Sequence, residues 1–414
     1  MTLFTGREMK KLIIPVIVTL LVASVCAAEQ IAPPSPSVAN CLQQHTCPQL
    51  QAQYEKVTKE GERNFVLNQE QAGLMAFQLK EYDLATQSFD QALLRIESVF
   101  SNNERAAKAR SLWYEEGAKD FKGEPYERAM AYYYRGLLYL LRGDYENARA
   151  AYKNGILQDA FAEEQQYRCD FALLIFLEGW ASQCLGDFQT ANAAYAEVRK
   201  LRPDFVPPKP DDNTLLIVET GKSPRKVADG IGHDELKYRR GRNFTEKRAD
   251  VRIGDKLYPL YPMEDIFWQA ATRGGRLVDK ILKGKAEFME TQRASGEVLS
   301  NVSTAGIIAS SAPIGDTSAL HGVSAALGLV SVVQLAIALN VNPRADTRYW
   351  NNLPDTIHVI TLKTDPVSLK GPIKAEFLDA QKKVIPSLGA ELTLGNCGSG
   401  RYLGWTRSRS ALEK

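Results

Sequence analysis

Few residues of this sequence have the types and spacing that enzyme chemistry requires. Four histidines occur, and none lies on a zinc-hydrolase pattern of two histidines four residues apart with a glutamate between them. Cys397, in the glycine-rich segment 395–400, is a candidate nucleophile, but no histidine or acid can be assigned to it from spacing. Asp346 and Arg348 are the other candidates in the same half of the chain. We therefore expect no catalytic site, no metal and no cofactor.

Charge and loop composition narrow the classes of ligand. Lys and Arg number 51 against 49 Asp and Glu, and so balanced a chain argues against a nucleic-acid partner. The triplet 221–223 (Gly-Lys-Ser) resembles the end of a phosphate-binding loop, but Leu216 stands where that motif has its first glycine, so we expect a β-turn. Residues 222–252 carry ten Lys or Arg against five Asp or Glu. This segment is either a solvated basic loop or a contact for anionic lipid or wall polymer.

The cysteines are too few for a dense disulfide framework. Cys41 and Cys47 flank a short loop, and we expect them to form a disulfide in an oxidising compartment. Cys169 and Cys184 fall on one expected helix, where they would be about 22 Å apart and unable to pair.

The N-terminus has the order of a secretory signal. Basic residues precede the apolar run 12–25, and two alanines follow it, so we expect residues 1–28 to be a cleaved signal peptide. An uncleaved membrane anchor is the first alternative. Lipidation of Cys26 is the second, although Val25 stands where an acylation signal has a small residue.

Helical periodicity dominates residues 49–203, after a proline-rich spacer at 29–48. Within this helical domain a pattern recurs: a glycine, an aromatic nine residues later, an alanine three further, and another aromatic four beyond that. Its copies are Gly73, Tyr82, Ala85 and Phe89; Gly136, Tyr145, Ala148 and Tyr152; and Gly179, Phe188, Ala191 and Tyr195. Small residues such as Gly136 and Ala148 let the two helices of one hairpin approach closely, and we expect Tyr139, Tyr145 and Tyr152 to fill the space between successive hairpins. The spacing is typical of a tetratricopeptide repeat (TPR), here with irregular intervals between copies.

A TPR array has a concave side lined by the first helix of each hairpin. With Gly136 and Gly179 setting the phase, Tyr133, Leu137, Phe176 and Trp180 should lie towards that side, where they could bind an extended or helical peptide. Equally, the C-terminal half of the chain, or the segment inserted between the first and second copies, could pack there and make the same side chains ordinary core. On the helix surface, Glu124 and Arg128 at i, i+4 spacing are expected to form a solvated ion pair.

The composition changes after a proline-rich linker at 204–213. Residues 214–414 are expected to form an α+β domain with a small β-sheet and a helical insertion at about 265–342. The strand signals are 215–218, 356–362, 373–377 and 384–385. Residues 318–341 form a long uncharged run, which is either a buried helix or a membrane-contacting one.

Segments of both halves resemble a family of bacterial TPR-containing envelope proteins and putative lipoproteins. They are 123–128, 143–149, 221–226 and 345–350, the last leading into Leu353 and Pro354. The resemblance implies a repeat scaffold joined to a strand-containing domain, in the periplasm or on the periplasmic face of the outer membrane of a Gram-negative bacterium. It implies no reaction.

The fold expected from the sequence is thus multidomain, an all-α TPR domain followed by an α+β domain. The leading hypothesis is a non-catalytic, membrane-associated scaffold that recruits an envelope protein or peptide through its groove. The alternatives are an enzyme acting on cell-wall or other envelope polymer, and a structural subunit of an export apparatus.

Overall fold

The structure, a computed structural model, describes residues 47–98, 120–159, 170–229, 235–272, 346–365 and 372–412. The expected signal peptide, Cys26, Cys41, most of the spacer, Cys169 and the run 318–341 lie outside these residues, and the predictions for them stand as predictions. From Cys47 onward, the helical half and the strand-rich half form one compact unit.

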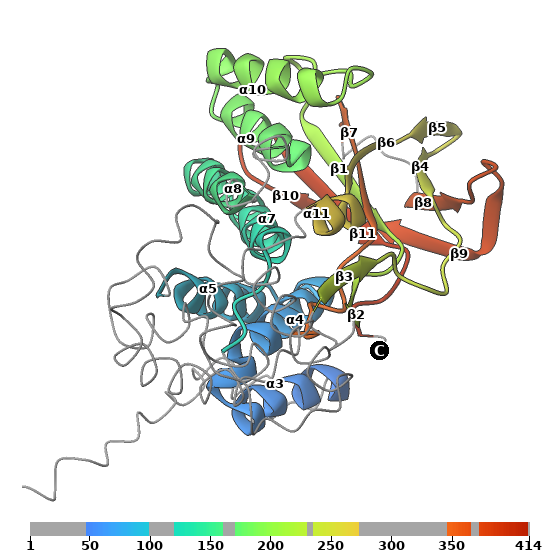
Figure 1. Cartoon of the computed structure of the whole chain (residues 1–414). Coiled ribbons are helices and arrows are strands. Elements are labelled where there is room, and N and C mark those ends of the chain that lie inside the picture. Colours follow the sequence, from blue (N-terminus) through green and yellow to red (C-terminus); the bar gives the residue numbers. More distant parts are fainter. Residues whose placement is uncertain are drawn as a thin grey trace, which may run out of the picture. The chain divides into compact units, whose positions relative to one another are not determined.

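The helical half contains consecutive antiparallel helix pairs (Figure 1). Its helices are α3 (Pro48–Glu60), α4 (Phe65–Gln78), α5 (Tyr82–Ser98), α7 (Pro125–Leu141), α8 (Tyr145–Asp159), α9 (Ala172–Cys184) and α10 (Phe188–Leu201), with a short 3-10 turn at Glu62–Asn64. Three hairpins follow from them: α4 with α5, α7 with α8, and α9 with α10.

The turn between the helices of a hairpin explains why each first helix stops. Gly143 and Gly186 have φ angles of 73° and 81°, the left-handed conformation that ends a helix and that glycine adopts without strain. The aspartate that follows caps the next helix: Asp187 accepts a hydrogen bond from the Thr190 backbone N–H at 3.1 Å. In the first hairpin Lys80 takes the left-handed position with a φ of 63°. The Gly-Asp-aromatic signal is therefore visible in only two of these turns.

The recurring glycines are contact points between the helices of each hairpin. A Cβ at Gly136 would lie 2.2 Å from the Tyr152 ring, and one at Gly179 would lie 2.6 Å from the Tyr195 ring. At Gly73 the nearest atom would be the Phe89 ring at 3.0 Å. The aromatic of the second helix thus packs directly on the glycine of the first, which agrees with the close approach of the two helices. The expected place of Tyr152 was wrong, because its ring lies within its own hairpin and not between successive hairpins.

The strand-rich half contains three sheets. The first has the order β10 (Leu394–Asn396), β11 (Tyr402–Arg407), β1 (Thr214–Thr220), β7 (Thr356–Leu362), β6 (Tyr261–Asp265). The second has the order β5 (Lys256–Pro259), β4 (Arg248–Ile253), β8 (Ile373–Leu378), β9 (Val384–Leu392). The third is a ribbon of β2 (Arg225–Asp229) and β3 (Glu235–Arg239). All four predicted strand segments are present, and the mixed helix and sheet content agrees with the expected fold class.

Strand β1 lies at the centre of the five-stranded sheet, parallel to β11 and antiparallel to β7. Its seven residues are all buried, because both of its faces are covered. Leu216 and Val218 join a hydrophobic cluster with Val251 of β4 and Phe377 of β8, so the second sheet packs on that face. The alternate residues of β1 point the other way, towards the first helices of the hairpins.

The Glu124 and Arg128 pair was expected on a solvated helix face, and this expectation was wrong. Glu124 is 7% exposed and accepts a hydrogen bond from the Lys226 ammonium at 3.1 Å. Arg128 donates instead to Gln158. Glu127, buried beside Glu124, bonds back to its backbone N–H at 2.7 Å and completes a capping box that starts α7. The cation that compensates the two buried glutamates is Lys226 of strand β2, which lies about a hundred residues further along the chain.

The contact at Gly136 gives a test of the hairpin packing. An alanine in place of a helical glycine normally stabilises a helix by about 1 kcal/mol. Here the added methyl group meets the buried Tyr152 ring, and overpacking costs about 1–3 kcal/mol. We expect Gly136→Ala to lower the free energy of unfolding, measured by urea denaturation. Gly389→Ala, in strand β9, is the control for an added methyl group, because no atom of the described residues lies within 4 Å of its Cβ position. A Gly136→Ala variant about 1 kcal/mol more stable than wild type, the gain expected of an unhindered helical alanine, would contradict the packing described here.

Candidate functional site

The concave side of the hairpins is filled by the five-stranded sheet. Tyr133 and Tyr134 of α7 donate hydrogen bonds to the Glu219 carboxylate of β1, at 3.2 and 3.0 Å. Trp405 of β11 donates to the same carboxylate at 2.9 Å, and the ring of Phe77 from α4 packs edge-on against its indole. One buried carboxylate thus joins the helices to the sheet.

The four residues expected to bind a partner lie in this interior. Tyr133 and Leu137 are 0% exposed, and Phe176 and Trp180 are 1% and 3% exposed. Phe176 packs edge-on against Phe205, in the segment that links α10 to β1. The chain's own residues contact two of them: Tyr133 donates to Glu219 of β1, and Phe176 packs on Phe205. A partner could contact these buried side chains only if the interior opened.

The residues that the sequence offered as catalytic candidates make structural contacts or are buried. Asp346 and Arg348 pair with each other at 2.7 Å, and Arg348 also donates to the backbone of Arg63. Burial raises the pKa of the Cys397 thiol to about 12, which is opposite to the change that a nucleophilic thiol needs. Burial also lowers the pKa of His358 to about 3, so its ring stays neutral beside the Thr220 hydroxyl.

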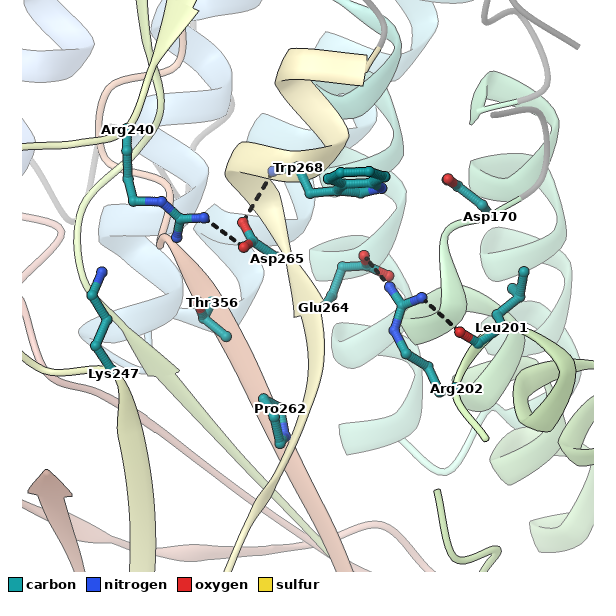
Figure 2. Close-up of a pocket in the computed structure, with 10 residues that line it drawn as sticks. All are labelled: Asp170, Leu201, Arg202, Arg240, Lys247, Pro262, Glu264, Asp265, Trp268 and Thr356. Atoms are coloured by element: carbon teal, nitrogen blue, oxygen red, sulfur yellow. Dashed lines mark hydrogen bonds and ion pairs between the residues drawn. The ribbon is translucent and has the colours of Figure 1, made fainter. Parts of the chain in front are cut away.

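A cleft of about 620 Å³ opens where the end of the helical half meets the edge strand β6 (Figure 2). The side chains around it come from the segment before α9, the end of α10, the β3–β4 connection, β6, the short helix α11 (Ile266–Thr272) and the start of β7. They are Asp170, Leu201, Arg202, Arg240, Lys247, Pro262, Glu264, Asp265, Trp268 and Thr356. This cleft combines accessible aromatic surface with charges of both signs, and it is our candidate binding site.

Trp268 is held in place by the turn from β6 into α11. Asp265 accepts a hydrogen bond from the Trp268 backbone N–H at 3.0 Å, which caps the first turn of the helix. The indole is 47% exposed. Figure 2 shows it between the acidic side chains of β6 and Asp170. The cap fixes the backbone of Trp268, and its exposed indole offers an aromatic stacking surface in the cleft.

The cations of the cleft are paired with acids. Arg240 donates to Asp265 at 2.6 Å and to Asp355 at 2.5 Å, while Lys247 lies 3.8 Å from Asp355. Because positive and negative groups alternate, the cleft suits a ligand of mixed charge better than a simple anion.

Glu264 is the buried member of the cleft. Its carboxylate accepts hydrogen bonds from Arg202 at 3.2 Å, from Gln269 at 2.9 Å, and from the Leu173 backbone N–H at 3.1 Å. Burial raises the pKa of Glu264 to about 7, although Arg202 and the other donors act to lower it. These contacts join the starts of α9 and α11 to the end of α10.

Sequence reasoning missed this cleft. Strand β6 was not predicted, because Pro262 argues against a strand. Proline is tolerated there because β6 is an edge strand. The available signal was Asp265, an acidic residue placed as a cap before an apolar helix. The basic segment 222–252 forms β2, β3 and β4, and its Lys226 is buried between Glu124 and Glu127. Arg239, Arg242 and Arg248 remain exposed.

The chain matches no known family model, and no curated protein or solved structure is significantly similar to it. Within the described ranges, no three His, Cys, Asp or Glu side chains gather in a group able to hold a metal ion. None of the helices that the structure describes is long and apolar enough to cross a membrane.

The pKa of Glu264 predicts a pH dependence. In the native state the pKa is raised from its ordinary value of 4.5 to about 7, so in that interval the folded protein holds a proton that the unfolded chain has lost. Stability from this group is therefore present at low pH and lost as pH rises through 7. The Glu264→Gln variant has no titratable side chain at this position. We expect the free energy of unfolding of wild type, relative to this variant, to fall by about 3 kcal/mol between pH 4.5 and 7.5. The measurement is urea denaturation across this range, with exposed Glu391→Gln as the control. A difference that stays constant with pH would contradict the assignment.

Proposed function

We propose that this chain is a non-catalytic TPR-type scaffold of the bacterial envelope that binds a protein or peptide partner through the cleft around Trp268. The glycine and aromatic contacts in the three hairpins are those expected of TPR packing, and they support this assignment. The expected signal peptide supports export to the periplasm, and the family resemblance supports membrane association.

The observation that carries the proposal is the contrast between the two surfaces. On the concave side, Glu219 and its hydrogen-bond donors close the groove, and the aromatic side chains there are buried. In the cleft, Trp268 is exposed and its backbone is fixed by Asp265. Stable binding anchors are aromatic side chains with a charged or polar rim, which is what this cleft offers.

The chemistry of the cleft indicates the kind of partner. A peptide segment could place an apolar or aromatic side chain against Trp268 and exchange charged groups with Arg240 and Asp265. Because these two groups already pair with each other at 2.6 Å, a partner must replace that contact. Affinity should therefore depend more on the indole than on any one charge.

Site-specific photo-crosslinking in cells tests the proposal. A diazirine amino acid in place of Pro262, which is exposed and lines the cleft, leaves Trp268 intact and should give adducts with a discrete envelope protein. The same probe at position 180 should give crosslinks within this chain, because Trp180 is 3% exposed. The 262 adduct should be lost when Trp268→Ala removes the indole. Intrachain adducts alone from position 262, or the same foreign protein from position 180, would overturn the choice of surface.

Segment 222–252 is proposed as a second contact, for anionic lipid or wall polymer, through the exposed Arg239, Arg242 and Arg248. We expect the purified protein to co-sediment with phosphatidylglycerol vesicles at low salt, and replacement of the three arginines by glutamine to reduce the bound fraction several-fold. Replacing the exposed Lys382 and Lys383 on the β8–β9 turn is the matched control. Equal losses for the two sets would indicate nonspecific charge attraction.

A further inference from the structure

Two cysteines from distant parts of the chain have no role in the proposed function. Cys184 is the last residue of α9 and is half-buried, while Cys397 is buried in the connection between β10 and β11. Both carry free thiols in this structure. Two separate sets of contacts connect the segments that carry Cys184 and Cys397.

The first set of contacts runs through the start of α8. The Tyr145 hydroxyl donates to the backbone carbonyl of Cys397 at 2.6 Å. One helical turn further, Arg149 lies 3.4 Å from Asp187, three residues after Cys184. The same face of α8 therefore contacts the turn after Cys184 and the turn that holds Cys397.

The second set runs through the short turn 209–212. Gln183, the neighbour of Cys184, donates to the Lys209 carbonyl at 2.8 Å. Arg401, four residues after Cys397, donates to the Asp212 carbonyl at 2.5 Å. Both cysteine-bearing segments are thus attached to one four-residue turn.

The Cys184 thiol also acts on Cys397. Burial raises the pKa of Cys397 to about 12, and the Cys184 thiol contributes to the rise. The Tyr152 hydroxyl, buried and without a hydrogen-bond partner among the described residues, has its pKa raised by burial and then by both thiols. These shifts agree with the contacts above, which attach both cysteine-bearing segments to one face of α8 and to one turn.

We propose that Cys184 and Cys397 form an intramolecular disulfide that ties the last hairpin of the helical half to the β10–β11 turn. Gly398 and Gly400 follow Cys397 with positive φ angles and open space at their Cβ positions, so the turn has room to adjust to disulfide geometry. The bond would close a loop of about 210 residues. A loop of this length lowers the conformational entropy of the unfolded chain more than a short loop does.

The chemistry is thiol–disulfide exchange with a protein or small-molecule disulfide as oxidant. Burial raises the pKa of both thiols to about 12, so the exchange is slow at neutral pH and faster at alkaline pH. The Cys184 thiol, the more accessible of the two, loses its proton, attacks the oxidant disulfide, breaks its S–S bond and forms a mixed disulfide. The small thiolate fraction of Cys397 then attacks the Cys184 sulfur and displaces the oxidant's second thiol. Two protons and two electrons leave the cysteine pair, and the oxidant becomes a dithiol. In the cell this step rests on the proposed envelope location, since a reducing compartment would oppose it.

The test uses the purified full chain and so does not depend on location. After incubation with oxidised glutathione, free thiols are blocked with N-ethylmaleimide and the protein is digested without reductant. Trypsin and chymotrypsin are used together, because one tryptic peptide carries both Cys169 and Cys184. We expect a Cys184–Cys397 cross-linked peptide, two hydrogen masses below the sum of its parts, that disappears on adding dithiothreitol.

Thermal unfolding provides a second readout. Oxidation should raise the apparent Tm by roughly 5 °C in wild type and leave it unchanged in Cys397→Ser treated in the same way. Two results would overturn the proposal: complete alkylation of Cys184 and Cys397 after oxidation, or a bond from Cys184 to Cys169. Failure of the crosslinking experiment at the cleft would leave this test unaffected.

Discussion

The Glu219 carboxylate is the interaction on which the arrangement of the two halves depends. It lies on the central strand of the five-stranded sheet, is 0% exposed, and receives donors from helix α7 and strand β11. A buried carboxylate without such donors would be very costly, so the two tyrosines and the tryptophan must all be in place. Burial raises its pKa, and Arg407, 3.8 Å away, acts in the opposite direction. These donors therefore fix how the helices pack against the sheet.

This contact bears on the role proposed for the helical hairpins. A repeat array usually offers its concave side to another molecule. Here the sheet of the same chain packs against the hairpins, and aromatic side chains that could line a binding groove lie in an interior. An exposed aromatic surface lies instead at the edge of the junction, where β6 turns into α11 and Trp268 is exposed. Under the proposed function, the hairpins support this cleft.

The sequence predicted the features that depend on local spacing. Gly136 with Tyr152 and Gly179 with Tyr195 could be recognised because each pair lies within one hairpin, and β7 could be recognised from its run of β-branched residues. Features that depend on distant partners could not. Glu124 looks like a surface residue until Lys226 of β2 is placed beside it. Strand β11 contains a glycine and lacks a clear alternation, and its identity follows only from its pairing with β1 and β10.

The position of β11 in the sheet has a consequence for how the chain reaches this state. The strand lies between β10 and β1, and its partner β1 precedes it by almost two hundred residues. The helical hairpins, whose contacts are local, can form early, whereas the sheet that covers them needs residues 402–407. A chain still emerging from a ribosome therefore has formed helices with an uncovered apolar face. Protection of that face, by a chaperone or by rapid completion of synthesis, is a requirement that this topology imposes on the cell.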